Sequence, residues 1–206
     1  MNIIEAIVKN KIYAVVRTSD AKRALEISNA LIKGGIKIIE IPLSNFDLLN
    51  VISELANREG VFISAGGIIT SKQAHLAYNN KAHMLVSPIY QKNIVKLSEE
   101  FNIPVMTPVS TANEAYQSWK ARVPISKLYP AAHMGGVEYV IDLVRPMPFL
   151  NLMPTGSIKI EEVNDYLEAG AIACGIGSDL YNGFDSDDIT KRAQKAVKLL
   201  NKNSPP

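Results

Sequence analysis

Short apolar segments recur along the chain and are separated by longer stretches of mixed polarity. Their starts lie about 20 to 25 residues apart, which is the spacing that one strand, one helix and two short loops require. The segments comprise residues 12–16, 36–41, 61–63, 83–86, 103–106, 125–129, 149–153 and 171–176. Each is short enough to be a strand, and the pattern therefore predicts eight strands.

The stretches between these segments carry helical patterns. In the stretch AKRALEISNALIKGG, Ala24, Ile27 and Leu31 form an apolar stripe at helical spacing. The pair Gly34–Gly35 closes the stretch with a typical helix stop. A helix is thus expected between each strand and the next.

Helix starts and the two chain ends can also be predicted. Three helices are expected to begin after the cap-like residues Ser71, Thr111 and Asp187. Residues 2–9 are expected to form a short helix that covers the bottom of the fold. Residues 201–206, with the sequence NKNSPP, are expected to be a frayed tail.

Strands that alternate with helices predict a parallel sheet, and eight such units are the number that closes into a barrel. The whole chain, residues 1–206, is therefore expected to be a single-domain α/β protein with a (β/α)8 TIM-barrel fold. An open, doubly wound sheet is the alternative. The barrel is favoured because uniformly short connections in 206 residues leave no room for an additional domain.

Composition and charge narrow the function classes. The chain is 47% hydrophobic, and its 22 Lys and Arg residues nearly balance 20 Asp and Glu residues, for a net charge of +2. So small a charge predicts no nucleic-acid partner and no attraction to a membrane surface. There is also no signal-peptide pattern and no apolar run long enough to span a bilayer. These features favour a cytoplasmic metabolic protein.

Cysteine and histidine give no metal or redox pattern. Cys174, the single cysteine, lies in the apolar run AIACGIG and is interpreted as an inert packed thiol. His75, His83 and His133 do not form a metal-ligand spacing with acidic residues and are interpreted as ordinary surface or packed histidines. No dinucleotide fingerprint or Walker loop is present, so neither a metal nor a cofactor is expected.

Reactive groups of such a barrel lie where its strands end, and two charged residues stand out there. Lys127, in the apolar strand PISKLYP, would be costly to bury as an ammonium. Desolvation and a neighbouring cation, which Arg17 could supply, favour the neutral amine that attacks carbonyl groups. The alternative is a lysine that extends to solvent or forms an internal ion pair.

Glu40 is the second residue. In GIKIIEIPL, strand alternation places Glu40 on one face with Ile36 and Ile38, and Lys37 on the other face. Glu40 is the better candidate for the barrel interior because it lies nearer the reactive end. It could transfer protons beside the lysine, or it could only balance the charge.

Two loops rich in small residues follow the seventh and eighth predicted strands. They read MPTGS and GIGSDL and contain Thr155, Gly156, Ser157, Gly177 and Ser178. The same two loops commonly build a phosphate site in such barrels from backbone N–H groups and hydroxyls. A phosphate or carboxylate site is therefore predicted there.

Nearly the whole chain resembles the 2-keto-3-deoxy-6-phosphogluconate and 4-hydroxy-2-oxoglutarate aldolases. The resemblance depends on the order and spacing of AVVRT, ALIKGGIKIIEIPL, FISAGGIIT, MLVSPIY, IPVMTPVST, ISKLYPAAHMGG, LMPTGSI and CGIGSDL. It implies a metal-independent class I aldolase of carbohydrate metabolism, a homotrimer that acts on a small 2-oxo acid. Lys127 would be the Schiff-base lysine, Glu40 the proton-transferring carboxylate and Arg17 the arginine near them. Thr155 would hold the pyruvate carboxylate, and Ser178 would belong to the phosphate pocket.

The chain departs from the family pattern around the substrate. Ser44 stands where the family usually has an arginine in a TLRT-like stretch, and Gly67 replaces the threonine of GAGT. Ser157 replaces the second glycine of PTGG, and Ile89 ends what is usually an SPG motif. Whether the substrate is phosphorylated is thus left open by the sequence.

The expected reaction is reversible cleavage of 2-keto-3-deoxy-6-phosphogluconate to pyruvate and glyceraldehyde 3-phosphate. Cleavage of 4-hydroxy-2-oxoglutarate or a related 2-oxo acid is the nearest alternative. A noncatalytic ligand-binding barrel and a phosphosugar isomerase or epimerase are alternatives of other classes.

Overall fold

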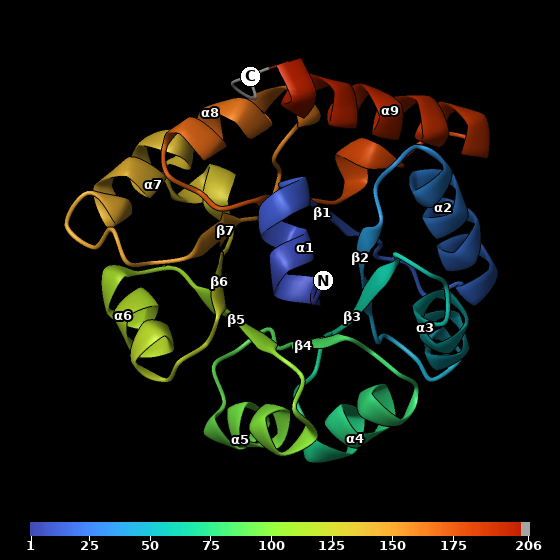
Figure 1. Ribbon diagram of the computed structural model, residues 1–206, viewed down its shortest axis with the longest axis horizontal. Helices are drawn as coiled ribbons and strands as arrows, with labels where there is room; N and C mark the ends of the chain where they lie inside the picture. Colours follow the sequence, from blue (N-terminus) through green and yellow to red (C-terminus); the bar gives the residue numbers. More distant parts are fainter. Residues whose placement is uncertain (203–206) are drawn as a thin grey trace.

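The computed structural model describes residues 1–202 and the side chains through residue 200. Within it, eight parallel strands form one sheet in the order β7-β6-β5-β4-β3-β2-β1-β8. The bridge between Thr155 and Gly175 joins the two ends of the sheet, and Figure 1 shows the strands as a ring surrounded by helices. The predicted (β/α)8 barrel is confirmed, and the sheet is not an open one.

Every predicted strand is present. Their bounds are β1 Ile12–Val15, β2 Ile38–Pro42, β3 Phe62–Gly66, β4 Met84–Val86, β5 Val105–Val109, β6 Ile125–Leu128, β7 Leu152–Pro154 and β8 Cys174–Ile176. The helices between them are α2 Ala21–Lys33, α3 Leu48–Ala56, α4 Ser71–Asn79, α5 Lys92–Phe101, α6 Ala112–Lys120, α7 Gly136–Val144 and α8 Val163–Glu168, and α9 Ser186–Lys202 follows β8. Three short 3-10 turns were not predicted: Ala131–Met134, Ile160–Glu162 and Ser178–Leu180.

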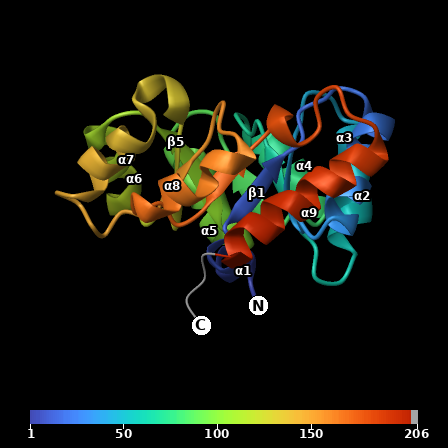
Figure 2. The same cartoon turned by 90° about the horizontal axis from the view of Figure 1, so that it is seen from above.

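The N-terminal helix α1, Ile3–Asn10, covers one end of the barrel. Its Ile3 and Ile7 pack against side chains that point inward from the strands, among them Tyr13, Ile38 and Met153. Figure 1 shows α1 over the centre of the strand ring, and Figure 2 shows it beneath the barrel. Because α1 occupies the end where the strands begin, only the opposite end is open to a substrate.

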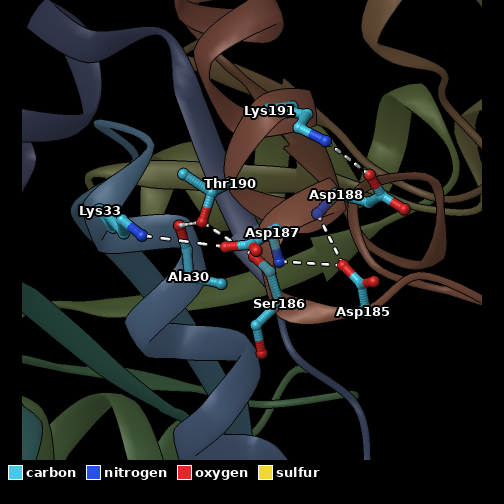
Figure 3. A network of polar contacts seen from close by, with 8 residues as sticks. All are labelled: Ala30, Lys33, Asp185, Ser186, Asp187, Asp188, Thr190 and Lys191. Carbon is cyan, nitrogen blue, oxygen red and sulfur yellow. Dashed lines mark hydrogen bonds and ion pairs between the residues drawn. The ribbon is translucent and has the colours of Figure 1, made fainter.

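The predicted helix caps were partly wrong. Thr111 caps α6 as expected, since its side chain accepts the N–H of Glu114. The cap of α4 is Thr70 and not Ser71, which is the first residue of the helix. For α9 the capping oxygen comes from Asp185, which accepts the N–H groups of Asp187 and Asp188 at 3.0 and 2.9 Å (Figure 3).

The last helix closes the outer ring by packing on the first barrel helix. The Thr190 hydroxyl lies 3.2 Å from the carbonyl oxygen of Ala30 in α2 and 2.9 Å from that of Ser186 (Figure 3). A side chain at Gly34 would collide with Ala193, so the two helices touch there through the glycine. Since α9 reaches Lys202, the first two residues of the expected tail are helical, and residues 203–206 lie outside the described residues.

No helix in residues 1–202 is both long and apolar enough to cross a bilayer.

Candidate active site

Lys127 and Glu40 meet inside the barrel mouth. The lysine Nζ lies 2.6 Å from Oε2 of the glutamate, and the two side chains are 10% and 4% exposed. They are contributed by β6 and β2, which are not neighbours in the sheet. The structure thus brings together, from positions 87 residues apart, the two groups that the sequence singles out.

Strand alternation explains why Glu40 points inward. Ile38 belongs to the barrel interior, whereas Ile39 and Ile41 pack outward against the helices. Lys37 is exposed, so Glu40 is the charged residue of β2 that faces the interior. One detail of the prediction was wrong: Ile36 precedes β2 and packs with the outer core, because the alternation begins only at Ile38.

The Glu40 carboxylate packs against β3 at Gly66, which has no side chain. A Cβ atom added to Gly66 would lie 2.5 Å from Oε1 of Glu40, closer than nonbonded atoms approach. Gly66 has no positive φ that would itself require glycine. The glycine is therefore needed for the space it leaves to the carboxylate.

Two hydroxyl groups lie inside the barrel near this pair. Tyr13 on β1 and Ser64 on β3 are fully buried, and neither hydroxyl has a hydrogen-bond partner among the described residues. Burial, followed by the negative charge of Glu40, raises the pKa of Tyr13 well above its usual value, and the proximity of its hydroxyl to Ser64 and to Glu40 adds smaller effects of opposite sign. The phenol is thus kept protonated below the carboxylate.

Two adjoining cavities open at the mouth. The one above the lysine and glutamate has a volume of about 430 Å³, and the other, of about 640 Å³, lies over the loops after β7 and β8. Val15, Arg17, Tyr129 and Thr155 line both. The shared walls make room for a ligand that reaches from Lys127 to the outer loops.

All the predicted site residues line one cavity or the other. The cavity over Lys127 is lined by Arg17, Glu40, Ser44, Gly67, Lys127 and Thr155. The outer cavity is lined by Arg17, Thr155, Gly156, Ser157, Gly177 and Ser178. Within residues 1–202, the guanidinium of Arg17 forms no ion pair and no hydrogen bond, so it is free to meet an anion. Its place in both cavities fits the prediction that it lies near the lysine.

The outer cavity presents backbone donors. Gly156 and Ser157 have φ angles of 106° and 57°, which turn this loop sharply at the rim. The N–H groups of Ser157 and Ser178 donate no hydrogen bond to any acceptor in the described chain. Small residues with free N–H groups allow close approach of an anion.

Sequence reasoning missed several residues of the site. Tyr129, His133, Lys159 and Tyr181 line the outer cavity. His133, which was interpreted as an ordinary histidine, is exposed on the turn after β6 and faces this cavity. Reading every residue of the loops that follow the strands, and not only small and charged ones, would have found them.

The remaining candidates lie away from the mouth. Burial raises the pKa of the Cys174 thiol to about 12, which agrees with an inert packed thiol. His83 precedes β4, and its Nδ1 accepts the N–H of Ile63 at the closed end of the barrel. In the part of the chain that the structure describes, no three His, Cys, Asp or Glu side chains form a group that could hold a metal ion.

The sequence model of the aldolase family described as KDPG and KHG aldolase matches residues 3–200. The chain belongs to this family. A 2-dehydro-3-deoxy-phosphogluconate aldolase from Haemophilus influenzae is 28% identical over 204 residues, which cover 96% of each chain. The match covers nearly all of both chains, and the resemblance seen in the motifs is confirmed.

Solved structures support the fold of this aldolase. The 2-keto-3-deoxy-6-phosphogluconate aldolase of Zymomonas mobilis, solved with 3-phosphoglycerate, superposes with a TM-score of 0.84 at 22% identity and 94% coverage of each chain. A KDPG aldolase from Legionella pneumophila, solved with pyruvate as a covalent carbinolamine intermediate, gives a TM-score of 0.83 at 23% identity. The shared portions are 94% of this chain and 97% of the Legionella chain.

Proposed function

We propose that this protein is a class I aldolase that reversibly cleaves 2-keto-3-deoxy-6-phosphogluconate to pyruvate and glyceraldehyde 3-phosphate. The observation that carries the proposal is the buried contact of 2.6 Å between Lys127 and Glu40. A lysine in a sheltered cavity, with a carboxylate that can accept its proton, is the arrangement that amine addition to a ketone requires. The family and the Haemophilus relative have the same named activity.

The reaction begins when Glu40 accepts a proton from Lys127 and the free amine adds to C2 of the 2-oxo acid. The protonated Glu40 then gives its proton to the carbinolamine hydroxyl and is again a carboxylate, while the hydroxyl leaves as water and yields an iminium ion. Its positive nitrogen withdraws the electron pair of the C3–C4 bond as Glu40 removes the C4 hydroxyl proton. The aldehyde leaves, the enamine takes a proton at C3, and water releases pyruvate and the free lysine. The carbinolamine of the Legionella enzyme is the first intermediate of this sequence.

The other lining residues would hold the two ends of the substrate. Thr155, whose side chain is buried beside the lysine cavity, is proposed to bind the pyruvate carboxylate. Arg17 would neutralise an anion between the two cavities, and Gly67 leaves the wall beside Ser44 without a side chain. No metal is assigned a role in these steps.

The distal phosphate is assigned to the outer cavity. Its free N–H groups at Ser157 and Ser178, with Gly156 and Gly177 beside them, offer donors to an anion without requiring the arginine that Ser44 replaces. Cleavage of 4-hydroxy-2-oxoglutarate, which needs no phosphate site, is the second candidate because the family includes both activities. The homotrimer, the cytoplasmic location and a single domain over residues 1–206 stay predictions.

Borohydride reduction in the presence of pyruvate tests the proposed chemistry. We expect one reduced pyruvate on the peptide that contains Lys127, because reduction converts the iminium into a stable secondary amine. Lys37, exposed just before β2, is the matched lysine that should stay unmodified. Folded protein with an unmodified Lys127 would refute the class I mechanism. An adduct without cleavage of either donor would favour the noncatalytic binding barrel.

Gly66→Ala should impair catalysis with little effect on the backbone. The added methyl group would occupy the space of Oε1 and push the Glu40 carboxylate away from Lys127. Displacement of a catalytic group by about 1 Å can lower the rate by about 100-fold, and we expect a loss of that order in kcat. Steady-state cleavage assays measure it, with the exposed Lys37→Met variant as the control. If Gly66→Ala is as active as wild type, the carboxylate does not need the glycine.

A further inference from the structure

The interior of the barrel keeps two hydroxyl groups without any assigned role. Tyr13 and Ser64 are each 0% exposed, and their oxygen atoms are the buried side-chain N and O atoms that lack a hydrogen-bond partner in the described chain. A buried hydroxyl that stays unpaired destabilises the folded state. Two of them inside the barrel therefore call for a partner nearby.

Both hydroxyls lie on the side of the interior where Glu40 is placed. In the parallel ladders, Glu40 is level with Val15 on β1 and with Ser64 on β3. Tyr13 comes two residues before Val15 and so points into the barrel as well. The centre of its ring is 5.9 Å from Nζ of Lys127.

Within the described residues, the inner apolar cluster supplies no oxygen or nitrogen acceptor to these hydroxyls. Its other side chains come from the inward faces of the strands and from α1, among them Ile3, Ile7, Ile38, Met84, Met106, Ile125, Met153 and Ala173. The Glu40 carboxylate is the charged acceptor beside them. In agreement with this placement, the charge of Glu40 and the approach of the phenol to it both raise the pKa of Tyr13, while the approach to Ser64 lowers it.

Glu40 in turn needs a second partner during the reaction. Its Oε2 accepts a hydrogen bond from Lys127, while Oε1 faces Gly66 and accepts none from the described residues. An ammonium has three N–H donors, whereas the iminium nitrogen has one and is fixed to the substrate. A buried carboxylate that loses its main donor would rotate or change its charge unless another donor holds it.

We propose that Tyr13 and Ser64 are positioning residues that hold the Glu40 carboxylate from inside the barrel while Lys127 is bonded to the substrate. The Tyr13 hydroxyl donates to the carboxylate, and the Ser64 hydroxyl joins the same hydrogen-bonded group. The inference rests on the proposed aldolase function. It assigns to β1 and β3 a role in proton transfer that neither residue type indicates in the sequence.

The test separates imine formation from proton transfer. Borohydride trapping with pyruvate reports the imine on Lys127, and exchange of the pyruvate methyl protons in heavy water, followed by NMR, reports proton transfer by Glu40. For Tyr13→Phe, which keeps the buried ring, we expect trapping within about twofold of wild type and exchange slower by about tenfold. Ser64→Ala should show the same split with about a threefold loss. Tyr166→Phe, a buried tyrosine of α8 outside the barrel interior, is the control and should leave both measurements unchanged.

The other outcomes of this test refute either the inference or the proposed function. If exchange by Tyr13→Phe equals that of wild type, the inference is wrong and the proposed function stands. If trapping and exchange fall in proportion, the tyrosine serves packing alone and the inference is also wrong. If Tyr13→Phe does not fold, Ser64→Ala decides by the same split. Wild-type protein that neither traps nor exchanges pyruvate would refute the proposed function, and the inference with it.

Discussion

Lys127→Met is expected to lower kcat/KM for cleavage of 2-keto-3-deoxy-6-phosphogluconate by about 10⁴-fold or more, because among the described residues no other amine lines the cavity over Glu40. In residues 1–202, the lysine is the one cationic side chain that the structure pairs with Glu40 inside the barrel. Steady-state assays against the Lys37→Met control measure the loss. A phosphosugar isomerase or epimerase would tolerate the change much better.

Folding of this variant has to be measured beside its activity. Removing one partner of a buried ion pair leaves the other charge uncompensated and can cost about 3–5 kcal/mol of stability. Lys127→Arg keeps a positive charge for Glu40 but cannot supply a neutral amine, so it should be folded and equally inactive. The double variant Lys127→Met with Glu40→Gln removes both charges and should recover part of the stability. Cleavage by a folded Lys127→Arg protein would contradict the covalent mechanism.

The positions of the two charged residues could be predicted because strand alternation is strict. One residue in two faces the interior, and a charge near the end of a strand in a barrel must lie at the mouth. This argument selected Glu40 over Lys37, and the cost of burying an ammonium in an apolar strand singled out Lys127, both without any contact information. The eight strands were predictable for a similar reason, since buried parallel strands are short apolar runs.

The features that the sequence did not predict are set by contacts between side chains. Thr70 and Ser71 are both good caps, and only the position of the side chain relative to Gln73 decides between them. Tyr13 lies within the first predicted strand, and nothing local reveals that its hydroxyl lacks a partner. His133 lies on a short turn, where no periodicity indicates which way a side chain points.

Glu40→Gln should separate imine formation on Lys127 from proton transfer. The amide has the shape of the carboxylate but cannot accept and return a proton, so cleavage should slow by about 10²- to 10⁴-fold, as is typical for loss of a general acid–base group. The KM for the substrate should change far less, since Glu40 contacts Lys127 and not the outer cavity. Without its carboxylate, Lys127 is buried without a counter-ion, and desolvation then favours the neutral amine. Borohydride trapping of pyruvate should therefore persist.

Comparing Lys127→Met with Glu40→Gln shows which of the two residues carries imine formation and which carries proton transfer. Lys127→Met should lose trapping, proton exchange and cleavage together, because all three depend on the iminium. Glu40→Gln should keep trapping, while exchange of the pyruvate methyl protons falls as far as cleavage does. If Glu40→Gln exchanges these protons at the wild-type rate, the carboxylate only balances the lysine charge and another group must carry the proton. Because Glu40 is 3% exposed and touches the amine directly, we expect the exchange to be lost.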